Sequence, residues 1–398
     1  MKILYLCPEI PYPADSGGKV AFQNHIEMIT KNNHVDAFFL DADGTGYTIP
    51  STVKAKFNNY KVYSRDIPRA TGMMGKLTAF YHFLISPFPR AYSVRSSREL
   101  TKDLEDCIGD YDVVVFDHFS TFAFVNDHIF KKKISKSIYI SHNLEAGVIQ
   151  DQFRLENNVL KKLYHYIEYL KTKAAETKIL KTVDQVVTIS TGDFDVLNKL
   201  YPDKSIVNIP EILPLADRSW SAGAKQTITF LGGSKYFPNY EAIDWLVKVL
   251  HPELKNSAID IAIIGSVANY LDDNPEARKL NNLNFYGYVA DEHLDQHLLN
   301  SSIFISPILY GAGIKIKVLK AISLGIPIFC TNESLFGIEY LKTIPELIFD
   351  RADLATTVTD LKNIIGDTTK LQEISTEILE RSGKQEVVIN AKWAQLLT

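Results

Sequence analysis

The stretch at positions 306–325, SPILYGAGIKIKVLKAISLG, constrains the fold more than any other part of this sequence. The apolar run at 303–305 is typical of a buried strand, and apolar residues at helical spacing after Gly313 predict a helix. Gly311 and Gly313 lie between them, where glycine lets the backbone adopt a positive φ or approach a ligand closely. The sequence therefore predicts a strand, a tight turn and a helix, the repeating unit of α/β proteins.

The helix expected after this turn carries Lys315, Lys317 and Lys320 near its start. The first turn of a helix has unpaired N–H groups and partial positive charge, so cations are unfavourable there unless an anion binds among them. A phosphate group would supply that anion. The alternative is a solvated basic helix start after an ordinary turn, and these residues alone do not separate the two.

The segment GAGIKIKVLKAISLGIPI resembles the signature helix of retaining glycosyltransferases of family 4, which have the GT-B fold. The matching positions are Gly311, Gly313, Lys315, Lys317, Ala321, Gly325 and Pro327. Lys320 departs from the pattern, because the family has a glutamate there that holds the ribose hydroxyls of the donor. Ala312 stands in place of an earlier family glutamate, as in the Gly-Ala-Gly subgroup. The resemblance implies an α/β protein of two facing Rossmann-like domains with an interdomain cleft and a C-terminal helix that crosses back to the first domain.

Composition excludes several classes of protein. A chain of 398 residues is long enough for two domains, and its net charge of -4 provides no general attraction to nucleic acid or to an anionic membrane. Three cysteines without metal-ligand spacing fit a reducing cytosol. No stretch approaches a membrane span or a secretory signal, so any membrane contact is expected to be peripheral.

We expect four segments along the chain. They are an N-terminal, acceptor-side domain at 1–205, a proline-containing linker at 206–225, a nucleotide-sugar-binding domain at 226–380, and a final helix at 381–398 that returns to the first domain. Trp393 is the expected anchor of that helix.

Two places in the first half are candidate ligand contacts, because ligands bind at the carboxyl ends of parallel strands. Gly17 and Gly18 follow the expected strand 2–7 and precede a helix expected from about Val20, and His142 comes just after Ser141 at the end of the expected strand 138–140. Under the resemblance, the glycines border the donor diphosphate and the transferred sugar, and His142 positions that sugar. A plain strand-to-helix turn and a structural histidine are the alternatives, and His118 is given the structural role.

In the second half, Gly232 and Gly233 follow the expected strand 227–231, and Lys235 follows them. A lysine after a Gly-Gly turn suits a diphosphate, because it donates three N–H groups to dispersed negative charge. Under the resemblance the complete donor-binding set is Gly17, Gly18, Gly232, Gly233, Tyr286, Gly287, Tyr288, Val289, Gly311, Ala312, Gly313, Ile314, Lys317 and Lys320.

The segment 61–98 is basic and aromatic, with seven lysines or arginines against one acid, Asp66. Arg90, Arg95 and Arg98 are candidates to hold a phosphorylated or lipid-linked acceptor at a membrane surface. The alternative is a pair of helices with buried rings and a solvated charged face.

These features predict an enzyme that transfers sugar from a nucleoside diphosphate to a glycan or lipid-linked glycan, in polysaccharide, lipopolysaccharide or glycoconjugate assembly. The enzyme is expected in the cytoplasm, and at the inner face of the cell membrane under the membrane-surface alternative. His142, Lys235 and Lys315 are the expected catalytic residues. No metal, cofactor or nucleic-acid partner is expected. A catalytically impaired scaffold of the same fold, suggested by Lys320, and a nucleotide-sugar epimerase remain open; a dehydrogenase is disfavoured because no GxGxxG opens the first helix.

Overall fold

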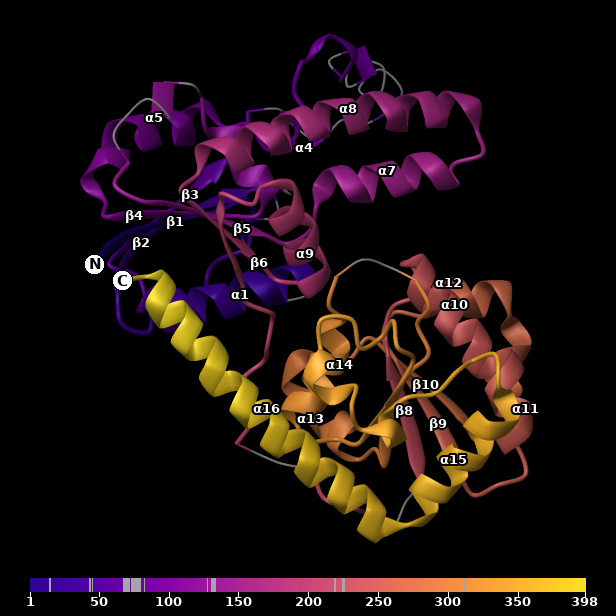
Figure 1. Cartoon of the computed structure of the whole chain (residues 1–398). Helices are drawn as coiled ribbons and strands as arrows, with labels where there is room; N and C mark the ends of the chain where they lie inside the picture. The colour runs from indigo at the N-terminus through magenta and orange to yellow at the C-terminus, as the bar shows by residue number, and fades with distance from the viewer. Residues whose placement is uncertain are drawn as a thin grey trace. The chain divides into compact units, whose positions relative to one another are not determined.

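A seven-stranded parallel sheet organises the first half of the chain in the computed structural model, with the strand order β3-β2-β1-β4-β5-β6-β7 (Figure 1). Its strands are β1 (Lys2–Cys7), β2 (His34–Asp41), β3 (Asn59–Ser64), β4 (Val113–Asp117), β5 (Ser137–Ser141), β6 (Gln185–Thr188) and β7 (Ser205–Asn208). Residues of β4 and β5 are buried throughout, as expected for parallel strands covered on both faces.

Helices cover this sheet and connect its strands. They are α1 (Gly17–Thr30), α2 (Ser51–Lys54), α4 (Arg90–Ser93), α5 (Arg98–Cys107), α7 (Glu145–Leu155), α8 (Val159–Thr182) and α9 (Thr191–Leu200), with short 3-10 turns η1 (Ile108–Asp110) and η2 (Phe119–Phe124).

A second parallel sheet has the order β10-β9-β8-β11-β12. Its strands are β8 (Thr227–Leu231), β9 (Asp260–Ile264), β10 (Leu283–Gly287), β11 (Ile303–Ser306) and β12 (Ile328–Cys330). The helical elements around it are α10 (Phe237–Trp245), the π-helical turn η3 (Leu246–Leu250), α11 (His251–Leu254), α12 (Ala268–Asp273), η4 (Pro275–Lys279), α13 (Asp291–Leu299), α14 (Ile316–Ser323), η5 (Glu339–Leu341), η6 (Pro345–Leu347), α15 (Leu354–Gly366) and α16 (Thr368–Leu396).

The structure describes residues 1–13, 16–42, 44, 46–66, 72, 80–81, 83–126, 128–129, 134–217, 220–223, 226–310 and 313–398, with the backbone alone at 291 and 292. Two compact units divide the chain, one made of Met1–Glu211 with Asn390–Thr398 and the other of Ile212–Ile389. Among the described residues no helix is long and apolar enough to cross a membrane.

The final helix α16 ends in the first unit, as expected. Trp393 is buried there, with its ring 5.7 Å from that of His25. The side chain of Lys136 donates to the carbonyl of Leu396 over 2.6 Å, and Lys392 donates to the carbonyl of Asn208 over 2.8 Å. Two Rossmann-like units with a helical C-terminus therefore agree with the expected fold class.

Several elements differ from the sequence-based expectation. The edge strands β3 and β7 were not expected, because both are largely exposed or half-buried and lack an apolar run; β7 lies where the linker was expected to begin. Helix α1 begins at Gly17 rather than near Val20, because the side chain of Ser16 caps it by accepting from the N–H of Lys19. Residues 368–396 form one helix instead of two, and Ser382 within it is buried.

Each sheet has one switch point, where the strands that follow in the sequence are added on the opposite side of the first strand. In the first sheet this point lies between β1 and β4, and in the second between β8 and β11. Ligands bind at such switch points, outside the carboxyl ends of the strands. The two candidate half-sites are therefore built on the segments that leave these strands.

Candidate active site

The half-site of the first unit centres on Asp117, the last residue of β4. Its carboxylate accepts three hydrogen bonds, from the hydroxyl of Tyr5 over 2.5 Å, from Nδ1 of His25 over 2.7 Å, and from Nε2 of His142 over 2.7 Å. All four side chains are buried. Parallel pairing of β4 with β5 brings the ends of the two strands together, so that Asp117 meets His142 directly after β5. The expected position of His142 at a strand end is thus confirmed, while its role stays a prediction.

His25 links this cluster to the end of the first unit. Its Nε2 atom lies 2.5 Å from Oε1 of Glu211, and Oε2 of Glu211 accepts from the side-chain amide of Asn24 over 2.7 Å. Burial by itself lowers the pKa of His25, but the charges of Asp117 and Glu211 outweigh it and raise that pKa to about 10. His25 is therefore an imidazolium that bridges two carboxylates.

The protonation of His142 follows from this charge balance. Burial alone would raise the pKa of Asp117. The charge of His25 and the hydrogen bonds from His142 and His25 outweigh burial and hold the pKa of Asp117 well below its usual range. Burial also lowers the pKa of His142. Because His25 already compensates the charge of Asp117, His142 is neutral and carries its proton on Nε2 toward Asp117, which makes its Nδ1 atom a hydrogen-bond acceptor.

His25, Asp117 and His142 are also residue types that bind metals, and one ligand atom from each lies within 4.8 Å of the others. Metal binding needs neutral imidazoles with a free lone pair. Both nitrogens of His25 face carboxylates, and Nε2 of His142 is engaged by Asp117. The donor set fits a hydrogen-bonded network better than a resident metal.

The neighbours of His142 have structural partners. Nδ1 of His118 accepts from the N–H of Ser120 over 3.1 Å, and its Nε2 lies 3.4 Å from Glu145. The carboxylate of Glu176 accepts from the N–H of Glu145 over 2.8 Å and so caps the start of α7. Burial raises the pKa of Glu176 to about 7. The start of α7 is therefore closed by a protein carboxylate.

The remaining candidates of the first unit lie on separate elements. Gly17 and Gly18 occupy the first turn of α1, and among the described residues no atom beyond the local backbone lies within 4 Å of where a Cβ of Gly18 would be. Arg90 begins α4 and donates to the hydroxyl of Tyr164 over 3.5 Å. Arg98 begins α5, where its N–H donates to Asp66 over 3.0 Å, and Arg95 lies half-buried between these helices.

The half-site of the second unit forms where the loop after β8 meets α14. A Cβ at Gly232 would lie 2.8 Å from Nζ of Lys317 and 2.9 Å from Cγ of Asn239, so a side chain at position 232 would displace the lysine. Nζ of Lys317 donates to Oδ1 of Asn239, whose Nδ2 donates to the carbonyl of Gly233 over 3.0 Å. Gly232, Gly233 and Lys317 are therefore brought together as expected, and Asn239 is a contact that was not foreseen.

Two lysine side chains of this half-site are held in a poorly solvated place. The ammonium of Lys317 lies 4.8 Å from the centre of the Phe230 ring, and burial together with the charge of Lys315 lowers its pKa to about 7. Burial lowers the pKa of Lys315 to about 8, although Glu333 raises it, and its Nζ donates to the carbonyl of Gly313 over 2.8 Å. An anion bound here would restore the charged form of both lysines.

The other candidates of this unit lie at the end of β10 and in the loops that follow β8, β10 and β11. Gly313 has a φ of 74°. The side chain of Ile314 packs against Gly337, where an added Cβ would lie only 2.3 Å from Cγ1 of Ile314. Gly287 has a φ of 68° and its carbonyl accepts from the N–H of Gly265 over 2.7 Å. Lys235, Tyr286 and Tyr288 are exposed, and Val289 is half-buried. Gly311 and Ala312 lie outside the described residues.

Lys320 differs from its expected place. The helix α14 begins at Ile316, so Lys320 lies in its last turn, where a cation is favourable, rather than near its start. Its Nζ atom lies 2.5 Å from Oδ1 of Asp295 on α13. Lys320 therefore lies toward the other end of α14 from Lys315 and Lys317, and Asp295 balances its charge, while its role toward the donor stays a prediction.

Sequence reasoning missed His25, Asn24 and Glu211. His25 lies on the apolar face of α1 between Phe22 and Ile26, and a histidine on such a face is a signal that could have been used. Glu211 carried no such signal, because its partners are set by the tertiary fold.

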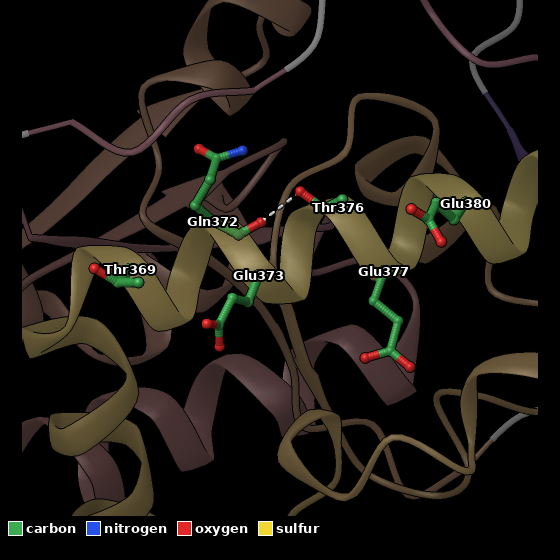
Figure 2. Close-up of a pocket in the computed structure, with 6 residues that line it drawn as sticks. All are labelled: Thr369, Gln372, Glu373, Thr376, Glu377 and Glu380. Carbon is green, nitrogen blue, oxygen red and sulfur yellow. Dashed lines mark hydrogen bonds between the residues drawn. The ribbon is translucent and has the colours of Figure 1, made fainter.

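A surface hollow of about 360 Å³ lies on α16, and none of its lining residues belongs to either half-site. Figure 2 shows its lining residues along one side of the helix, with the Thr376 hydroxyl donating to the carbonyl of Gln372 over 2.8 Å. Three of the lining residues are glutamates, Glu373, Glu377 and Glu380. Negative charge there opposes binding of a diphosphate, so we assign this hollow no role in the site.

Two Rossmann-like units, joined by a C-terminal helix that begins in one and ends in the other, define the GT-B fold of glycosyltransferases. The chain is similar in structure to sucrose-phosphate synthase from Thermosynechococcus elongatus, with a TM-score of 0.69 and 14% identity over 100% of this chain and 98% of that one. It is also similar to Anabaena HepE, solved in complex with UDP and glucose, with a TM-score of 0.65 and 12% identity over 100% of this chain and 99% of that one.

Sequence comparison points the same way. Residues 225–365 match the family Glycosyl transferases group 1. An uncharacterized 44.6 kDa protein in the cps region of Klebsiella pneumoniae is 23% identical over 330 residues, which cover 80% of each chain. The chain therefore has the GT-B fold, and its match to group 1 supports glycosyl transfer as its class of activity.

Proposed function

We propose that this protein is a retaining glycosyltransferase that moves a sugar from a nucleoside diphosphate to a hydroxyl of a glycan or lipid-linked glycan. The observation that carries this proposal is the pair Lys315 and Lys317 at the switch point of the second sheet, with pKa values lowered by burial to about 8 and about 7. A buried pair of cations is costly by itself and becomes favourable when a diphosphate joins it. The second unit is then the donor-binding domain and the first the acceptor-side domain.

In the proposed reaction, the bond between the anomeric carbon and the diphosphate oxygen breaks while the acceptor oxygen bonds to the same face of that carbon. The acceptor proton passes to the departing phosphate oxygen. Lys315, Lys317 and Lys235 stabilise the charge that develops on the diphosphate, together with the helix start near Gly18. His142 accepts a hydrogen bond from a sugar hydroxyl through Nδ1, and no side-chain nucleophile or metal is assigned.

A peripheral membrane contact through Arg90, Arg95 and Arg98 belongs to the same proposal, since a lipid-linked acceptor lies at a membrane surface. Replacement of the three arginines by glutamate should abolish pelleting of the protein with anionic liposomes. Unchanged pelleting would remove these residues from the proposal.

The first test is a thermal-shift screen against UDP, GDP, dTDP, ADP and CMP, each with and without a chelator. A ligand at about 100 times its dissociation constant stabilises the folded state by about 2.7 kcal/mol. Stabilisation by one diphosphate in the presence of the chelator supports a metal-independent donor site. A folded sample that responds to none of them contradicts the proposal.

A second test separates transfer from the two other uses of the fold. With the donor identified, a retaining enzyme keeps the anomeric configuration in its product, as measured by NMR coupling at the anomeric proton. Interconversion of the free donor sugar without acceptor would identify an epimerase. Binding of the complete donor without turnover toward any acceptor would favour the scaffold alternative.

A further inference from the structure

The turn between α7 and α8 exposes large apolar side chains next to one another. Leu155 is 81% exposed, Val159 80% and Leu160 79%. Figure 1 shows α7 and α8 lying side by side and meeting at this turn. Soluble proteins expose single apolar residues freely, but a cluster of them marks a contact surface. We refer to Leu155, Val159, Leu160 and Leu163 as the α7–α8 tip.

The apolar surface continues from the tip along α8. Val159, Leu163, Tyr166 and Leu170 follow one another at intervals of four, three and four residues, which places them on one side of the helix. They are 80%, 56%, 44% and 48% exposed. Helix α8 therefore presents an apolar stripe that no described residue covers completely.

A second exposed segment packs against the neighbouring side of α8. The ring of Phe83 lies 4.5 Å from that of Tyr164, and the N–H of Arg90 donates to Glu168 over 2.8 Å. Between these two anchors Leu84, Ile85 and Phe88 are 50%, 58% and 56% exposed. The packing thus places the apolar residues of 84–88 beside α8.

The charges around this surface are mainly positive. Over 83–98 and 150–173 the sequence has eight lysines or arginines and three acids, a net charge of +5 in a chain whose total is -4. Lys161 and Lys162 lie between Leu160 and Leu163 of the tip, and Glu168 is buried. Apolar side chains beside cations complement a bilayer with anionic headgroups.

The backbone of the tip is also suited to a place with little water. Its exposed N–H groups at the start of α8 are capped, because those of Leu160 and Lys161 donate to Oδ1 of Asn158 over 3.1 Å each. Unpaired backbone groups are the main obstacle to burial among lipids. These two N–H groups therefore keep their hydrogen bonds when the tip enters the headgroup region.

We propose that the α7–α8 tip inserts into the headgroup region of an anionic lipid bilayer and anchors the first unit there, with the exposed side chains of 84–88 lying against the same surface. This inference rests on the peripheral contact proposed above and names the element that makes it. It does not depend on the chemistry of sugar transfer.

The experiment is co-sedimentation of the full chain with phosphatidylcholine vesicles that contain about 30% phosphatidylglycerol, compared with pure phosphatidylcholine. We expect binding to the anionic vesicles, weaker binding in high salt, and a loss of about tenfold or more in the triple variant Leu155→Gln, Leu160→Gln, Leu163→Gln. The matched control is Leu200→Gln with Val387→Gln, which changes residues that are 65% and 69% exposed on α9 and α16. The control should bind like the natural protein.

The outcomes separate this inference from the proposed contact. Absence of vesicle binding by the natural protein would overturn both. Binding by the natural protein that the triple variant keeps would overturn the role of the tip alone. A concentration-dependent dimer in light scattering that the triple variant loses, without vesicle binding, would assign the surface to a second copy of the chain and overturn the inference. Circular dichroism of the variant establishes that it is folded.

Discussion

Nδ1 of His25 lies 2.7 Å from Oδ2 of Asp117, and this contact joins two parts of the first unit that are 92 residues apart in the sequence. The same carboxylate accepts from His142, so the charge on His25 acts on His142 through Asp117. His25 is a positioning residue in this arrangement, because it holds Asp117 ionised while leaving His142 neutral.

Replacement of His25 by glutamine should lower the stability of the protein by about 3 kcal/mol near neutral pH, because it leaves two buried carboxylates without their cation. The folded pKa of His25 is raised to about 10, above its ordinary value of 6.5. Its contribution is therefore complete below about pH 6.5 and lost as the pH rises through about 10. Urea unfolding at pH 6, 8 and 10 should show the two proteins converging; a constant difference would contradict the assigned imidazolium.

His142→Ala should reduce turnover by about a hundredfold or more while the protein stays folded, since a hydrogen bond that orients the sugar is lost. The matched control is His118→Gln, because His118 has structural partners in Ser120 and Glu145. Steady-state kinetics with the donor from the nucleotide screen measure both. Near-normal turnover of the alanine variant would exclude His142 from the site.

Lys317→Met should abolish binding of the nucleoside diphosphate and at the same time stabilise the unliganded protein. The ammonium has no carboxylate partner among the described residues, and its pKa is lowered to about 7. Removing it relieves a cost on the order of 2 kcal/mol, after allowance for partial exposure. Calorimetric titration and thermal unfolding measure the two effects, and a less stable variant would argue that Lys317 is a structural cation.

Binding of the diphosphate should weaken as the pH rises from about 7 to 9. The free protein holds Lys317 and Lys315 with pKa values of about 7 and about 8, and the bound anion raises both. Binding at pH 8 is therefore accompanied by proton uptake. Titration calorimetry in two buffers of different ionisation enthalpy detects it, and identical heats would show that the lysines do not face the ligand.

Lys320→Glu should destabilise the protein, because it places a second carboxylate against Asp295, which now lies 2.5 Å from the lysine ammonium. The double variant Lys320→Glu with Asp295→Lys restores opposite charges and should regain most of the loss. The pair is partly exposed, so we expect an effect of about 1 kcal/mol. Equal unfolding midpoints for both variants would show that the pair contributes nothing to α14.

Much of the fold could be predicted from local pattern. The strands β1 (Lys2–Cys7) and β8 (Thr227–Leu231) occur where they were expected, because a strand buried on both faces is rich in apolar and β-branched residues. Both lie inside their sheets, with a paired strand on each side. The edge strands β3 and β7 have one or no fully buried residue and gave no such signal. Burial, rather than intrinsic propensity, thus decided which strands were visible in the sequence.

The candidate site divides in the same way. Glycines and lysines near the start of a helix indicated the loops at Gly232 and Lys317, because their role depends on local backbone geometry and charge. The bridge from Asp117 through His25 to Glu211 spans contacts 92 and 186 residues apart in the sequence, and no local pattern encodes such partners. The sequence alone determined the two Rossmann-like units and where their candidate ligand loops begin. Only the tertiary structure decided which carboxylates meet His25, because that depends on strand order and on where the chain returns to the sheet.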